Sequence, residues 1–111
     1  MTLMFCSFSN QPLILRVYGT ARAVHPRDAD WAELLPLFPT FAGSRQIYDL
    51  SIARVQTSCG SGVPRMTLGA QRGLTELEPF YAEMGEDDVR DFWQRKNTES
   101  IDGFDTGIFG T

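Results

Sequence analysis

The chain has 111 residues, of which 42% are hydrophobic, and a formal net charge of −4 at pH 7. This composition predicts one small globular domain with a modest core and excludes a disordered chain. The acidic balance argues against a nucleic-acid partner and against an anionic membrane surface, because both normally require a basic protein face.

Cysteine and histidine are scarce, which bears on metal sites and on the redox compartment. Cys6 and Cys59 form no CxxC unit and His25 is the single histidine, so spacing alone assembles no zinc or iron site. We expect two reduced thiols in a cytoplasmic protein. The apolar run at residues 3–8 is too short to cross a bilayer and lacks the flanks of an export signal.

Two strands are predicted at the start of the chain, over residues 2–8 and 13–24, because both segments alternate in side-chain character. Gly19 indicates a bend, a bulge or a close backbone approach within the second strand. One face of that strand reads as core, with Leu13, Leu15, Val17, Ala21 and Ala23. The other face suits either a binding surface or an ordinary solvated face, with Ile14, Arg16, Tyr18, Thr20 and Arg22.

A short helix is predicted next, with Asp28 as its N-cap and Pro36 at its end. Its apolar face has the i, i+3, i+4, i+7 spacing, in Trp31, Leu34, Leu35 and Phe38. Residues 44–57 then return to strand character. The apolar alternation slips near Ala53 and Arg54, which indicates a bulge.

Two helices are predicted over residues 74–84 and 86–97, separated by Gly85. Their expected buried stripe consists of Leu77, Phe80, Tyr81, Met84, Val89, Phe92 and Trp93. The tail, residues 98–111, is rich in glycine but also apolar, so we expect it to dock on a surface. The chain thus divides into strands and one helix (1–66), C-terminal helices (67–97) and a docked tail (98–111) within a single domain.

The turn RVQTSCGSGVP, residues 54–64, separates the strands from the later helices. Its glycines, hydroxyls and thiol suit a turn that contacts a ligand, and they equally suit a plain strand-to-helix connection. Cys59 is either a small turn residue packed against the sheet or a reactive thiol whose pKa Arg54 and Arg65 would lower.

Arginine supplies nine of the ten basic residues. Its planar group suits phosphate and carboxylate ligands, although a GC-rich coding sequence would produce the same bias. The candidates for an anionic ligand are Arg16, Arg22, Arg45, Arg54 and Arg65.

The predicted sheet has three strands, two open edges and apolar faces, which is unfavourable for an isolated monomer. Either a partner subunit covers it, or the chain is the C-terminal portion of a longer domain.

Several segments resemble a known family. Residues 3–8 and 12–22 resemble the central hairpin of the pyridoxamine 5′-phosphate oxidase family, whose split barrels bind flavin mononucleotide (FMN). The segments VQTSCG at 55–60 and SIDG at 100–103 resemble an oxidase-like branch of uncharacterised members.

The resemblance implies an α+β fold that is mainly β: a partial split β-barrel of antiparallel strands with a crossover helix and C-terminal helices. It also implies a homodimer with FMN between the subunits and a small-molecule redox substrate. Arg16 would contact the phosphate or the ring edge, and Tyr18 would offer a stacking surface. Gln56, Thr57 and Ser58 would donate to ring or ribityl oxygens.

The chain also departs from the true oxidases. Ile14 stands where they carry a cofactor-contacting glutamine, and their C-terminal tryptophan and arginine have no counterpart. We therefore expect a flavin-binding oxidoreductase-like protein without true pyridoxamine phosphate oxidase activity, and assign no catalytic residue. The alternative is a non-enzymatic dimerisation or ligand-binding module that has lost flavin binding.

Overall fold

A computed structural model of the chain describes residues 1–110. The chain separates into two compact units. The first unit consists of Met1–Val24 and Tyr48–Gly69, and the second of His25–Ile47 and the chain from Ala70 onward.

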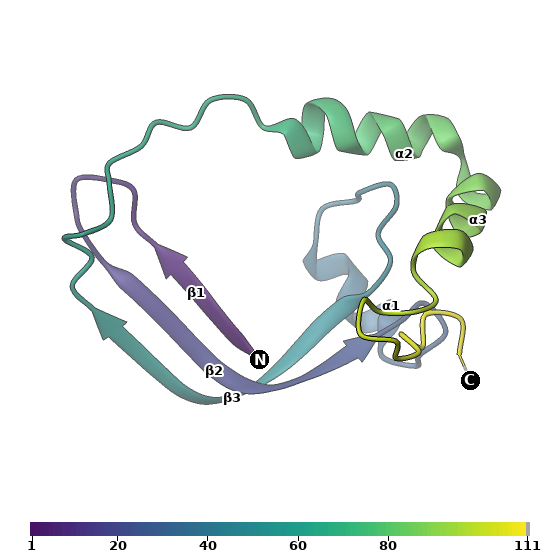
Figure 1. Cartoon of the computed structure of the whole chain (residues 1–111), viewed down its shortest axis with the longest axis horizontal. Helices are drawn as coiled ribbons and strands as arrows, with labels where there is room; N and C mark the ends of the chain where they lie inside the picture. The colour runs from purple at the N-terminus through teal and green to yellow at the C-terminus, as the bar shows by residue number, and fades with distance from the viewer. Residues whose placement is uncertain (111) are drawn as a thin grey trace. The chain divides into compact units, whose positions relative to one another are not determined.

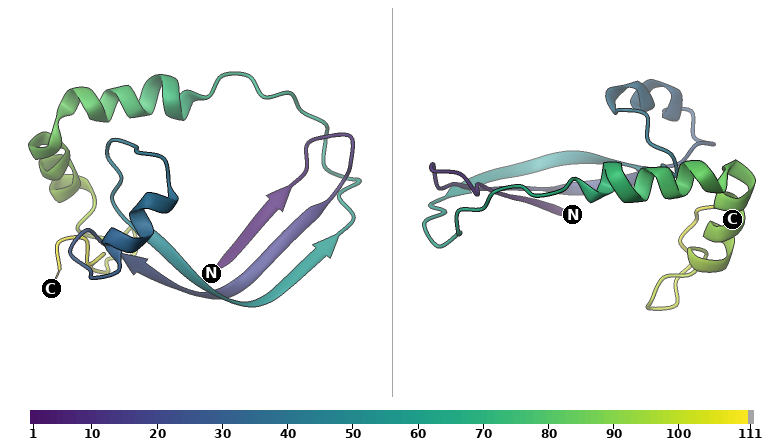
Figure 2. Two further views of the ribbon diagram at one scale, coloured as in Figure 1. Left: turned by 180° about the vertical axis from the view of Figure 1, so that it is seen from behind. Right: turned by 90° about the horizontal axis from the view of Figure 1, so that it is seen from above.

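The first unit is built on an antiparallel sheet of three strands in the order β1-β2-β3 (Figure 1). The strands are β1 (Thr2–Cys6), β2 (Ile14–Val24) and β3 (Ile47–Ser58), which form one layer (Figure 2). The register of β1 on β2 runs from Thr2 opposite Tyr18 to Cys6 opposite Ile14. The two expected strands thus pair as a hairpin, and the α+β fold is consistent with part of a split barrel.

Gly19 explains how β2 and β3 come close together. A Cβ atom at this position would overlap the carbonyl oxygen of Ser51 on β3. Of the three alternatives raised by the sequence, the structure therefore supports a close backbone approach.

The second unit contains the helices. A short helix α1 (Trp31–Leu34) continues into the 3-10 turn η1 (Leu35–Leu37), which contains a proline. The π-helical turn η2 (Gly73–Leu77) leads into α2 (Glu78–Met84), and α3 (Glu86–Lys96) follows. Gly85 separates α2 from α3 with a φ of 78°, as the sequence predicts.

The predicted N-cap of α1 is wrong. The helix begins after Asp30, whereas the carboxylate of Asp28 accepts a hydrogen bond from the backbone N–H of His25 at 2.7 Å. Asp28 therefore closes the turn at the end of β2, and the helix starts later in the chain.

Within the second unit, the tail is held to the rest of the unit by Arg27. Its Nη1 donates to the carbonyl of Ile108 at 2.8 Å, and its Nη2 donates to the carbonyl of Gly107. The Arg90 guanidinium lies 5.2 Å from the ring centroid of Phe109. Ile108 is one of the few buried apolar side chains.

The core is smaller than the sequence suggests. Among the described residues, the buried hydrophobic side chains are Val24, Val89 and Ile108. The expected stripe on the helices is only partly covered: Val89 is buried, Leu77 and Phe80 are exposed, and the other members are half-buried. On the face expected to be core in the second strand, Leu13, just before β2, is 47% exposed, whereas Leu15 and Val17 are half-buried. The amphipathic patterns are therefore present, but within a single chain they are only partly covered.

Candidate functional site

Four of the five predicted site residues come together on one face of the sheet. Arg16 Nη1 donates to Ser58 Oγ at 3.0 Å, and the Tyr18 hydroxyl donates to Gln56 Oε1 at 3.3 Å. Arg16 and Tyr18 share a face of β2 because side chains two positions apart point the same way, and the same holds for Gln56 and Ser58 on β3. We call these four residues the polar cluster.

Thr57 does not share this face. It lies between Gln56 and Ser58 in β3, so its side chain points to the opposite side of the strand. The alternation that assembles the polar cluster thus separates the fifth predicted residue from it.

An ion pair lies further along the same two strands, where Arg22 Nη2 contacts Asp49 Oδ2 at 3.0 Å. In a regular strand, Arg22 points to the same face as Arg16. Asp49, however, would point to the face opposite to that of Ser58. The bulge expected at residues 53–54 stays a prediction. Both members of the ion pair are about half exposed, so it contributes little to stability.

The turn after β3 packs against the start of β2. Gly60 is buried, and a Cβ atom there would lie 2.6 Å from the backbone nitrogen of Leu13. The N–H of Val63 donates to the carbonyl of Gly60 at 2.9 Å and closes the turn. Glycine at position 60 is therefore required by the close approach of two backbones.

Cys59 is exposed beside the polar cluster, and its sulfur lies 2.7 Å from Ser61 Oγ. Hydrogen bonds from the side chain and then the backbone of Ser61 lower the pKa of the Cys59 thiol. This cause differs from the expected one, which was the charge of Arg54 and Arg65. Arg65 instead donates to Asn10 Oδ1 at 3.2 Å.

Sequence reasoning missed two partners in this region. Ser61 stands two residues after Cys59, and this local spacing within a turn could have indicated the contact. Asp49 is 27 residues from Arg22, and no local signal connects them. Ile14 begins β2 and is in phase with Arg16, so an apolar side chain lies next to the polar cluster on the same face.

Within residues 1–110, no helix has the length and apolar character needed to span a bilayer. In the same part of the chain, no three His, Cys, Asp or Glu residues are grouped so that they could hold a metal ion.

No protein-family profile matches the chain, and no solved structure matches it. A pyridoxamine 5′-phosphate oxidase family protein of Aspergillus flavus is 28% identical to the chain over 116 aligned positions. The resemblance to the pyridoxamine 5′-phosphate oxidase family is confirmed. The alignment covers 92% of the chain and 46% of the relative, so the chain spans under half the length of that pyridoxamine 5′-phosphate oxidase family protein.

Proposed function

We propose that the chain belongs to the pyridoxamine 5′-phosphate oxidase family and is a flavin-binding, oxidoreductase-like protein that acts on a small-molecule redox substrate. The observation that carries this proposal is the polar cluster, in which β2 and β3 place a guanidinium, a phenol, an amide and a hydroxyl on one face. The similarity to the fungal relative supports it.

The donors of the polar cluster fit FMN chemically. A phosphate or an electron-rich ring edge requires positive charge and N–H or O–H donors. Arg16 uses one amino group to hold Ser58, and a guanidinium carries five N–H donors in all. Tyr18 is half-buried and offers an aromatic surface next to the Gln56 amide.

In this proposal Arg16 binds the phosphate or the ring edge, Tyr18 supports the flat ring, and Gln56 and Ser58 donate to ring or ribityl oxygens. Thr57 would contribute only from the opposite face of β3. The bound flavin would supply the electron transfer, while the protein holds and orients it. Ile14 stands where the true oxidases carry a cofactor-contacting glutamine. This difference supports a reaction other than pyridoxamine phosphate oxidation.

The proposed flavin site also requires a second copy of the chain. Both edge strands, β1 and β3, expose large apolar side chains, including Phe5 at 54% and Val55 at 58%. Open edges and large apolar patches are normally covered by another chain. We propose a homodimer in which this covering also builds the flavin cleft. Two free thiols, Cys6 and Cys59, support a reducing location such as the cytoplasm.

Two experiments test flavin binding and the homodimer. The first is size-exclusion chromatography with full-spectrum detection, and the second is titration of the protein with FMN under fluorescence detection. We expect a dimer that binds FMN saturably. Arg16→Ala should weaken FMN binding by about 10- to 100-fold, because a hydrogen bond to a charged group contributes roughly 1.5–3 kcal/mol. Arg95→Ala in the last turn of α3 is the matched control and should leave FMN affinity unchanged.

Ile14 also favours a second candidate function, a dimerisation or ligand-binding module without flavin. In that case the purified dimer is colourless and FMN shows no saturable binding up to high micromolar concentration. The same result would refute flavin binding.

A further inference from the structure

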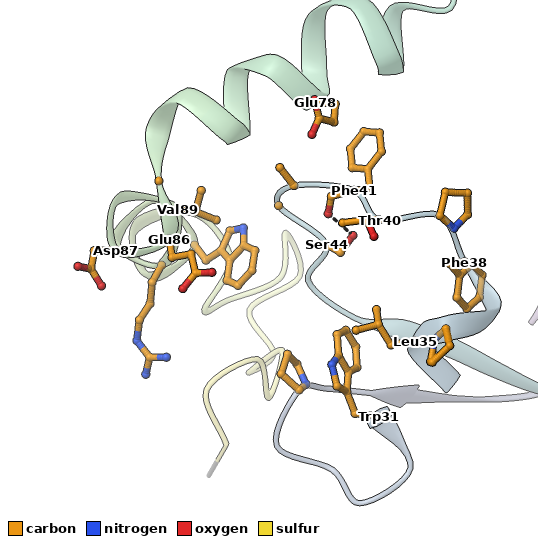
Figure 3. A pocket seen from close by; sticks show the side chains of 18 residues that line it. Trp31, Leu35, Phe38, Thr40, Phe41, Ser44, Glu78, Glu86, Asp87 and Val89 are labelled. Atoms are coloured by element: carbon orange, nitrogen blue, oxygen red, sulfur yellow. Dashed lines mark hydrogen bonds between the residues drawn. The ribbon is translucent and has the colours of Figure 1, made fainter. Parts of the chain in front are cut away.

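The second unit contains a pocket of about 890 Å³ that is separate from the polar cluster. Its walls come from α1 and η1, from the loop at residues 38–44, from the start of α2, and from α3 (Figure 3). This volume is within the range of small-molecule sites. The sequence did not indicate the pocket, because its aromatic residues have the spacing of ordinary core positions.

Aromatic side chains dominate the wall of the pocket. Trp31 and Phe38 come from the α1 region, Phe41 from the loop and Trp93 from α3. Trp31, Phe41 and Trp93 are half-buried, so part of each ring is open to a ligand. Aromatic faces carry partial negative charge and attract cations, tryptophan most strongly.

Carboxylates add negative charge at the rim. Glu78 from α2 lies on the side of Phe41, and Glu86 from α3 points toward the open centre, whereas Asp87 points away (Figure 3). Within residues 1–110, neither Glu78 nor Glu86 is in an ion pair. The basic residue of the wall, Arg90, places its guanidinium over Phe109 in the tail.

A metal ion does not fit this wall. Calcium and magnesium need about six oxygen ligands, and the described part of the chain offers no cluster of three metal-binding side chains. Rings together with separated carboxylates suit instead a cation whose charge is spread over carbon-bearing groups.

We propose that this pocket binds a small organic cation, with its ammonium group against the ring faces of Trp31 and Trp93 and near the carboxylate of Glu86. The proposal is independent of flavin binding, because every residue it uses lies in the second unit.

Intrinsic fluorescence gives a direct test, because both tryptophans of the chain line this pocket. The full-length protein is titrated with benzyltrimethylammonium, with neutral benzyl alcohol and with anionic benzenesulfonate, with excitation at 295 nm. We expect saturable quenching by the cation, with an affinity about 10-fold or more above that for benzyl alcohol. Increasing the salt concentration should weaken the cation binding.

Glu86→Gln should lower the affinity for benzyltrimethylammonium about 3- to 10-fold and leave that for benzyl alcohol unchanged. Glu83→Gln is the matched control, because Glu83 lies on α2 outside the pocket wall and its removal changes the net charge equally. Isothermal titration calorimetry repeats the comparison without relying on fluorescence. Equal affinity for the three probes, tighter binding of benzenesulfonate, or an equal loss in both variants would overturn the proposal.

Discussion

At the scale of single residues, the turn after β3 depends on one glycine and not on the other. A Cβ at Gly60 would lie 2.6 Å from the Leu13 backbone nitrogen, whereas a Cβ at Gly62 meets nothing within 4 Å. We predict that Gly60→Ala lowers the free energy of unfolding by about 1–3 kcal/mol, as overpacking does.

Urea unfolding followed by circular dichroism measures this difference. Gly62→Ala should change the free energy of unfolding by less than about 0.5 kcal/mol, as for an open surface site. Equal stability of the two variants would show that the turn does not pack on Leu13.

We predict that Ser61 raises the reactivity of the neighbouring Cys59 thiol at neutral pH. Its hydrogen bonds stabilise the Cys59 thiolate and lower the pKa of this thiol, so Ser61→Ala should raise it. Because the thiolate is the nucleophile, the pH midpoint of alkylation should move upward and the rate at neutral pH should fall.

This prediction is measured as the rate of iodoacetamide labelling against pH in a Cys6→Ser background, where Cys59 is the single thiol. Ser44→Ala, in the second unit, is the control and should leave the profile unchanged. An unshifted profile for Ser61→Ala would contradict the assigned hydrogen bond.

At the scale of elements, Gly85 sets the break between α2 and α3. Its φ of 78° and ψ of 163° belong to a region that residues other than glycine adopt only with strain. We predict that Gly85→Ala destabilises the protein by about 1–3 kcal/mol.

Gly73→Ala should change the free energy of unfolding in the opposite direction, and the same urea unfolding measures it. Gly73 begins η2 with open space around it, so alanine should stabilise the turn by about 0.5–1 kcal/mol. Destabilisation by both substitutions would imply that backbone strain at Gly85 is not the cause.

The elements were the part of the fold that the sequence could predict. Alternation located β1 and β2, and the helical spacing located α2 and α3, because local pattern and backbone geometry share one period. The start of α1 was misplaced, since Asp28 can cap a helix or close a turn, and the competition between them depends on the neighbouring His25 backbone.

The candidate site was predictable only in part. Alternation correctly groups Arg16 with Tyr18, but the pairing with Ser58 joins positions 42 residues apart and requires the register of β3. The position of Thr57 on the other face, by contrast, follows from alternation within β3 alone. The pocket of the second unit depends on how four segments meet, and no local pattern encodes that arrangement.

At the scale of the whole molecule, stability should depend on association. Few apolar side chains are buried within one chain, and hydrophobic burial is the main source of folding free energy. If a second copy supplies the missing burial, Tm rises with protein concentration, because mass action favours the folded dimer.

Differential scanning fluorimetry over a 100-fold range of protein concentration tests this prediction, and analytical ultracentrifugation over the same range reports the oligomeric state. A constant Tm in a sample that remains monomeric would contradict the homodimer proposal.

The hydrogen bonds from Arg16 to Ser58 and from Tyr18 to Gln56 each cross from β2 to β3. A ligand that contacts all four side chains can bind only after β2 and β3 have paired. Such a ligand would therefore stabilise the sheet once it has formed. Adding such a ligand during refolding should raise the yield of native protein.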